Sequence, residues 1–310
     1  MSVVSLGAFD LVSPLARGAM GQVWKARHRA TGLPVAVKLL APEVAADARS
    51  RRQLTQEIRA VAGLEHPHIV AVLDASATSE EEARGSGGRF GAGAPWVAME
   101  LASGGSLQDH PPSTFTELKA ALIDVLSALA HAHGRGLVHR DLKPSNLLYV
   151  ARRRDRPALK ISDFGLAVAM DETLVGDASA GTPQYMAPEQ ILGQAHEVGP
   201  WTDLFAVGCV AWWAATGAAP FERGTALATA RAALSEALPS FHPRFVCPPE
   251  FLGWLESLLA RVPFERPRRA ADALAALHPI EELLLGELDE EDEQTASFGR
   301  PVMSPDAPTQ

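Results

Sequence analysis

The sequence has few of the features that mark secreted, membrane-spanning or metal-scaffold proteins. Its 310 residues include two cysteines, Cys209 and Cys247, and no spacing of cysteine and histidine typical of a metal site, which excludes a disulfide framework or a zinc module. No apolar run reaches the roughly 18 residues of a membrane span; the longest candidate, 204–219, contains Gly217 and stops at Pro220. The N-terminus lacks the basic and apolar segments of a signal peptide. We therefore expect no membrane span and a cytoplasmic location.

Positive charge is scarce as well, and the acidic charge is unevenly placed. The net charge is −9, and from Gly286 onward seven acidic residues face one base, Arg300, so that segment carries −6 and the rest only −3. This near-balanced body gives no electrostatic sign of a nucleic-acid partner. Residues 286–310 are acidic, then rich in Pro and Ser, and cannot bury enough apolar surface to order themselves. We expect them to form a disordered acidic tail.

The pattern of apolar residues predicts strands first and helices afterwards. Segments 9–40, 69–73 and 96–101 are typical of strands. One helix is predicted among them, over 46–64, from its helical spacing of apolar residues. A long amphipathic helix is predicted from Ser113 onward, with further helices over 201–216, 225–237, 250–261 and 270–285. The length suits two packed lobes around a cleft. We expect an α+β fold, with a small, mainly β lobe and a larger, mainly α lobe that meet near 102–105.

Two segments lie outside the strands and helices predicted for the two lobes. Residues 77–94 are rich in Gly, Ser and Glu, and residues 152–154 are three consecutive arginines. Such composition predicts flexible surface loops. Docking sites for a partner protein are the alternative.

The first candidate functional residues lie in the strand-rich half of the chain. A glycine-rich segment, 15–23, stands between two predicted strands, where it could bring backbone N–H groups close to phosphates or simply form a tight turn. Lys38 closes an apolar strand fifteen residues after Val23, so its ammonium could reach phosphates held under that segment, or be a solvated strand end. A buried lysine needs a counter-charge. Glu57, on the predicted helix, is the candidate, unless it belongs to a solvated helix face.

The helix-rich half supplies carboxylates. Asp141 follows an apolar stretch and has Asn146 five residues later, and Asp163 follows a second apolar stretch. Phosphoryl transfer needs metal to neutralise the phosphates and a group that positions the attacking hydroxyl. Asp141 can do the second, while Asn146 and Asp163 offer the hard oxygen ligands that Mg²⁺ prefers. Lys143 can reach the transferring phosphate. Only five residues in the chain are lysines, and Lys38 and Lys143 are two of them, placed where a compact ammonium is apt.

Taken in order, these pieces resemble the eukaryotic-type protein kinases, and more closely the bacterial serine/threonine kinases of that group. The resemblance covers about residues 9–278. It includes the glycine-rich segment, the Val-Ala-Val-Lys strand ending at Lys38, the His-Arg-Asp run over 139–146, Asp-Phe-Gly at 163–165 and Ala-Pro-Glu at 187–189. It implies a two-lobed kinase fold with a nucleotide-binding N-lobe over 9–101 and a catalytic C-lobe over 102–285.

The resemblance also implies a role for each matching residue. The nucleotide, ATP, would be bound by Leu15, Ala16, Arg17, Gly18, Ala19, Met20, Gly21, Val23, Ala36, Lys38, Glu57, Met99, Glu100, Ala102 and Leu148. Lys38 would pair with Glu57. Asp141 and Lys143 would be catalytic, and Asn146 and Asp163 would bind Mg²⁺ or Mn²⁺.

Three further residues and a regulatory group follow from the same resemblance. Glu189 would form an ion pair with Arg266, and Asp203 would brace the catalytic loop. The regulatory residues would be Arg140, Thr173, Ser179 and Thr182. Phosphorylation between 166 and 182 could pair with Arg140 and order that loop. Lys143 and Thr182 resemble the branch that phosphorylates serine and threonine of proteins, and kinases of this group also pair during activation.

One departure from the family pattern leaves alternatives open. Ala16 stands where the first glycine of the phosphate loop is usual, which would weaken nucleotide binding. A pseudokinase that only binds is therefore an alternative, as is a small-molecule phosphotransferase of related fold. In the tail, Thr295 follows an acidic run and could be phosphorylated and bound by a phosphothreonine-binding partner; a plain solubilising tail is the alternative.

Overall fold

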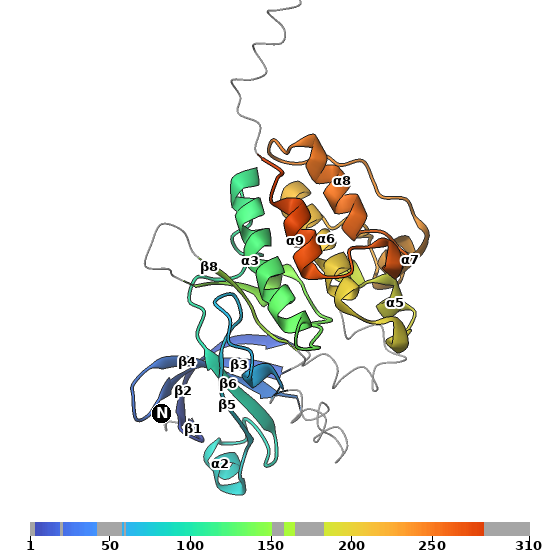
Figure 1. Ribbon diagram of the computed structural model, residues 1–310. Helices are drawn as coiled ribbons and strands as arrows, with labels where there is room; N and C mark the ends of the chain where they lie inside the picture. Colours follow the sequence, from blue (N-terminus) through green and yellow to red (C-terminus); the bar gives the residue numbers. More distant parts are fainter. Residues whose placement is uncertain are drawn as a thin grey trace, which may run out of the picture.

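The computed structural model consists of a β-sheet lobe and a helical lobe that meet at a cavity. It describes residues 4–18, 21–41, 58, 60–150, 158–164 and 183–281. In Figure 1 the strands β1 to β6 gather at the lower left and helices α3 and α5 to α9 at the upper right. The predicted α+β, two-lobed fold is confirmed.

The N-terminal lobe is built on one six-stranded sheet whose neighbours all run antiparallel. The order is β1-β2-β3-β4-β6-β5. The strands are β1 (Val4–Leu6), β2 (Phe9–Gly18), β3 (Gly21–His28), β4 (Pro34–Leu40), β5 (Val72–Ala77) and β6 (Pro95–Glu100). β4 is buried along nearly its whole length, which explains why its residues other than Lys38 are apolar. Pro14 is tolerated within β2 because the β2–β3 register shifts next to it.

The prediction of a surface loop over 77–94 is wrong in part, because residues 80–85 are helical while 86–94 form turns and bends. This segment contains a short helix, α2 (Glu80–Gly85), that begins at a capping box formed by Ser79 and Glu82. Glu82 also accepts a 2.7 Å hydrogen bond from the N–H of Gly7, in the β1–β2 turn. Phe90 packs on the apolar core of the sheet. The segment is therefore fastened to the sheet by a cap that glycine-rich composition conceals.

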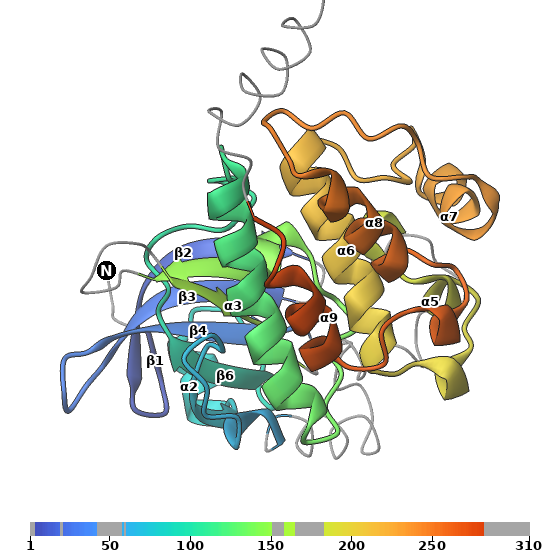
Figure 2. The ribbon, with the colours of Figure 1, turned by 45° about the horizontal axis from the view of Figure 1, so that its top comes forward.

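The C-terminal lobe is organised around two long helices, α3 (Phe115–His133) and α6 (Pro200–Thr216). α6 is buried on almost every side, as expected for a helix that is apolar all round, and includes Cys209, which is fully buried as its apolar surroundings predict. α6 ends at Gly217, whose φ of 95° forms a left-handed cap. Around these two pack α5 (Pro188–Ile191), α7 (Ala226–Ser235), α8 (Pro249–Leu258) and α9 (Ala270–Leu277). Figure 2 shows α9 lying between α3 and α6.

The predicted helices exist, but several of their ends differ. The helix predicted over 270–285 ends at Leu277, and that over 250–261 ends at Leu258. The strand predicted over 69–73 begins only at Val72. Of the helix predicted over 46–64, Ile58 and residues 60–62 are helical, and most of the remainder lies outside the described residues, as does 286–310. No helix in the described part of the chain has the length and apolar character needed to cross a membrane.

The two lobes are joined behind the cavity by backbone and side-chain bonds. A small second sheet in the C-terminal lobe pairs β7 (Leu147–Val150) with β8 (Ala158–Ile161). Ile161 of β8 bridges in parallel to Ile69 of the N-terminal half. Lys160, the residue before it, makes a 2.6 Å ion pair with Glu100 at the end of β6. The strand ladder and this ion pair fix where the cavity walls from each lobe face one another.

Candidate active site

A cavity of about 1140 Å³ lies between the lobes. It gathers residues from β2, β3, β4 and β6 on one side and from the loops around β7 and β8 on the other. Among its walls are Leu15, Ala16, Arg17, Gly18, Gly21, Val23, Ala36, Lys38, Met99, Glu100, Ala102, Asp141, Lys143, Asn146, Leu148 and Asp163. The structure thus brings together in one cavity the described residues that the sequence assigned to nucleotide, metal and catalysis.

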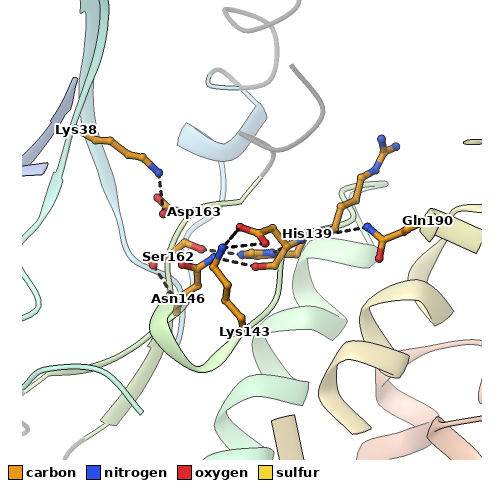
Figure 3. Close-up of polar contacts among 9 residues, drawn as sticks. Lys38, His139, Lys143, Asn146, Ser162, Asp163 and Gln190 are labelled. Atoms are coloured by element: carbon orange, nitrogen blue, oxygen red, sulfur yellow. Dashed lines mark hydrogen bonds and ion pairs between the residues drawn. The ribbon is translucent and has the colours of Figure 1, made fainter. Parts of the chain in front are cut away.

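Lys38 and Asp163 face each other across this cavity. The Lys38 Nζ lies 2.8 Å from the Asp163 Oδ2, and the lysine side chain is almost fully buried. Figure 3 shows the lysine extending from its strand toward the carboxylate. Burial without a counter-charge would disfavour the ammonium, so in this structure Asp163 supplies that charge. The expected partner, Glu57, lies outside the described residues.

The backbone at Asp163 and Arg140 has an uncommon conformation. Both residues have positive φ, 91° and 66° respectively. Side-chain-bearing residues rarely adopt this region, and it is costly unless the surroundings hold it. The two positions therefore mark the points where the chain is bent to aim polar groups into the cavity.

Asp141 is held by the residues that follow it. The Lys143 Nζ lies 3.0 and 2.8 Å from the two carboxylate oxygens of Asp141. The Asn146 Nδ2 donates to the Asp141 carbonyl at 2.8 Å and to its carboxylate at 3.2 Å. A short helical turn, Pro144–Asn146, makes this spacing possible because it folds Asn146 back toward Asp141.

His139 holds the same loop from beneath and is fully buried. Its Nδ1 accepts the N–H of Asp141 at 3.2 Å, so the proton lies on Nε2, which donates to the Ser162 carbonyl at 2.7 Å. The ring therefore links the loop of Asp141 to the residue before Asp163. Its role was not anticipated from the sequence, although His139 opens the motif.

Asp203 of α6 holds the loop from below, as the resemblance implied. Its carboxylate accepts the N–H groups of His139 and Arg140, both at 2.8 Å, and bonds the His133 ring at 2.8 Å. Burial alone would raise the pKa of Asp203, but the hydrogen bond and charge of the His133 ring and the hydrogen bond from the His139 N–H lower it overall. The carboxylate stays ionised because the N–H groups of His139 and Arg140 and the ring of His133 all bond to it.

The ion pair between Glu189 and Arg266 is also present. Two nitrogens of Arg266 lie 2.8 and 3.0 Å from the two oxygens of Glu189, with both side chains buried. Thr202 adds a 2.7 Å bond to the same carboxylate. This two-pronged pair joins the short helix α5 to the segment after α8.

The donor set in the cavity fits a magnesium ion held together with nucleotide phosphates. Asn146 and Asp163 contribute hard oxygens to the same cavity. Across the described ranges there is no group of three or more His, Cys, Asp or Glu side chains that could hold a metal ion. Mg²⁺ commonly binds through one or two protein oxygens plus phosphates and water, so this sparse set suits it.

Several assigned residues cannot be placed, and others were missed. Ala19, Met20, Glu57, Thr173, Ser179 and Thr182 lie outside the described residues. The N–H of Glu100 donates to the Ala71 carbonyl at 2.9 Å, so it is not a donor for a nucleotide base. Toward its far end the cavity is also lined by Tyr185, Trp213 and Glu222. Nothing in local sequence marks these three, because the cavity unites segments distant along the chain.

A β-sheet lobe and a helical lobe that enclose such a lysine, aspartate and asparagine define the protein kinase class of fold. The family model for the protein kinase domain matches residues 9–277, and the chain belongs to this family. It is 35% identical over 286 residues to the serine/threonine-protein kinase PknA of Mycobacterium tuberculosis, covering 89% of this chain and 63% of that protein.

Other relatives agree. The chain is 31% identical over 280 residues to the serine/threonine-protein kinase pkn3 of Myxococcus xanthus, covering 86% of this chain and 49% of that protein. Its structure is similar to that of the Mycobacterium tuberculosis PknI kinase domain, with a TM-score of 0.63 and 26% identity over 90% of this chain and 97% of that one. The chain therefore spans less than two thirds of the length of these two curated relatives.

Proposed function

We propose that this chain is a protein serine/threonine kinase that transfers the γ-phosphate of ATP to hydroxyls of protein substrates, in signal transduction of the bacterial type. The observation that carries the proposal is the convergence of Lys38, Asp141, Asn146 and Asp163 on one cavity, in a chain that belongs to the protein kinase domain family. Membership of this family and the geometry of these four residues together support an active kinase.

The residues of the catalytic loop divide the work of transfer. Asp141 orients the substrate hydroxyl and accepts its proton as the oxygen attacks phosphorus. Lys143, in contact with both oxygens of Asp141, places a positive charge beside the phosphoryl group as it moves between oxygens. Because His139 and Asn146 hold the Asp141 backbone, the carboxylate needs no rearrangement at the moment of reaction.

The nucleotide is positioned from the opposite wall. The Lys38 ammonium binds the α- and β-phosphates, and Asp163 and Asn146 would hold Mg²⁺, or Mn²⁺ in its place. The metal neutralises phosphate charge when bound. Ala36 and Leu148 enclose the adenine, with Met99 at the back of the pocket; all three line the cavity.

Regulation and partners are part of the same proposal. Arg140 lies beside Asp141, and a phosphate placed by autophosphorylation on Thr173 or Ser179 would order the loop that contains them. We propose that two copies of the kinase meet for this step. Thr295 in the acidic tail is a second candidate acceptor, to be bound by a phosphothreonine-binding partner. The three candidate acceptors, Thr173, Ser179 and Thr295, lie outside the described part of the chain.

The test is transfer of radiolabelled γ-phosphate from ATP with Mg²⁺, onto the chain itself and onto a generic basic protein. We expect label on serine and threonine, loss of transfer with a chelator, and loss of at least a thousandfold in Asp141→Asn. Thermal unfolding and nucleotide binding should be unchanged in that variant. Equal transfer by both proteins would overturn the proposal, and nucleotide binding without any transfer would make the chain a pseudokinase. Mapping the phosphorylated sites decides between Thr173, Ser179 and Thr295.

A further inference from the structure

The side chain of Gln190 connects the helix α5 to the catalytic loop. Its Nε2 donates to the carbonyl of Arg140 at 2.7 Å, and its Oε1 accepts the N–H of Ala187 at 3.2 Å. Figure 3 shows the amide reaching toward the catalytic loop from the helix opposite. The two contacts also settle the orientation of the amide, because a carbonyl can only accept and an N–H can only donate.

The peptide groups on both sides of Arg140 are thereby held by side chains from elsewhere in the fold. Asp203 accepts its N–H at 2.8 Å, and Gln190 donates to its carbonyl. Arg140 has a φ of 66°, a conformation that residues with a Cβ rarely adopt without such support. Since Arg140 precedes Asp141 directly, the orientation of its carbonyl decides where the Asp141 side chain begins.

The backbone that carries Gln190 is held in place by the residue before it. Its neighbour Glu189 is nearly fully buried and makes the two-pronged ion pair with Arg266, at 2.8 and 3.0 Å. α5 has only four residues and is too short to hold a position by its own hydrogen bonds. The buried ion pair therefore anchors the helix, and Gln190 extends that anchor to the catalytic loop.

We propose that Gln190 is a positioning residue for phosphoryl transfer, which sets the Asp141 carboxylate through the Arg140 carbonyl. The inference rests on the proposed kinase activity. The competing explanation is that Gln190 only caps α5 through its bond from Ala187. The two bonds use different atoms of one amide, and so they can be separated by substitution.

Gln190→Glu separates them. The introduced carboxylate still accepts the N–H of Ala187, so the cap remains, but it cannot donate to the Arg140 carbonyl and faces it with a negative charge. At pH 7.5 we expect kcat to fall at least tenfold, with the KM for ATP within about twofold of wild type and an unchanged melting temperature. A residue needed only for the cap would leave kcat as it was.

The pH dependence of kcat distinguishes a positioning role from a purely structural one. The introduced carboxyl, half-buried and facing a carbonyl, has its pKa raised, and its protonated form can again donate to Arg140. The ratio of variant to wild-type kcat should therefore rise at least threefold as the pH falls from 7.5 to 5.5. Gln190→Met removes both bonds, so its kcat should be as low and its ratio should not change with pH.

The control is Gln194→Leu, four residues along in the same segment, whose kcat and melting temperature should match wild type. A kcat of Gln190→Glu within twofold of wild type, or a ratio that is flat with pH, overturns the proposal. Failure of both Gln190 variants to fold also overturns it, because Gln190 would then be a determinant of the fold. If wild type itself shows no Asp141-dependent transfer, the proposed function fails instead, and that result is distinguishable from all of these.

Discussion

The catalytic loop and the glycine-rich hairpin face the same cavity, yet they are held in opposite ways. The loop is held by hydrogen bonds from several parts of the fold: His139 is fully buried, and Asp203, Asn146 and Gln190 each bond its backbone. In the hairpin of β2 and β3, residues 14–18 are exposed and pair with β3, while β3 also pairs with β4 from Gly21 to Arg27.

This contrast matches the different demands on the two segments: the catalytic loop would act on the reacting groups, and the hairpin would control entry of the nucleotide. Groups that exchange protons and phosphoryl oxygens must be held close to their reactive positions, and the loop is over-determined for that. Under the proposed function the exposed β2 end of the hairpin would cover a nucleotide that must enter and leave, and exposed segments with few tertiary contacts are those that open locally.

The largest effect is expected at the buried anchor of α5. Arg266→Met leaves Glu189 charged, buried and without its partner, which typically costs about 3–5 kcal/mol of stability. Denaturant unfolding should show this loss. The matched control is Arg269→Met, which breaks an exposed pair with Asp272 and should leave the free energy of unfolding close to that of wild type. Similar losses in the two variants would contradict the account of a buried anchor.

The second prediction removes the brace beneath the loop. Asp203→Ala leaves the N–H groups of His139 and Arg140 and the ring of His133 without their acceptor, in a buried place. We expect a loss of about 3 kcal/mol, measured by urea unfolding, and a fall in kcat larger than any rise in the KM for ATP. A stable variant with normal kcat would show that the loop holds its shape without Asp203.

The third prediction concerns the open side and compares two glycines of one hairpin. Gly21 has a φ of 132°, and a Cβ there would lie 1.9 Å from the Leu39 carbonyl oxygen, whereas a Cβ on Gly18 would meet nothing within 4 Å. Gly21→Ala should lower stability by about 2 kcal/mol and raise the KM for ATP severalfold. Gly18→Ala should change stability by less than about 0.5 kcal/mol. Unfolding and steady-state kinetics on both variants check this, and equal effects would count against it.

The smallest effect is a pH dependence where the two lobes join. Burial, with the rings of His131 and His68 nearby, lowers the pKa of His66 to about 4, against roughly 6.5 when unfolded. Between these values the unfolded chain binds more protons, so stability falls as pH falls through that window. His66→Asn should lose about 1 kcal/mol less than wild type between pH 7 and pH 4.5, because the half-exposed ring is partly screened. Parallel pH profiles from urea unfolding would refute this.

Much of the site could be predicted because its chemistry is written in residue type and order. Asp141, Asn146 and Asp163 follow apolar stretches that become the strand ends and loops around β7 and β8, and their donor types match phosphoryl transfer. The loop at 77–94 was mispredicted because its composition outweighed a four-residue capping signal from Ser79 to Glu82. Gln190 gave no local signal, since a polar residue in a short helix most often faces solvent.

By itself the sequence determined which side chains are the candidates for phosphoryl transfer, the order of strands and helices, and the burial of α6. These depend on local periodicity and on residue type. The tertiary structure alone decided that Lys38 meets Asp163, 125 residues away, and that Asp203 and Gln190 close on the two sides of Arg140. Such pairs form only when the packed lobes bring distant backbone together, and no pattern along the chain encodes which carbonyl an amide will find.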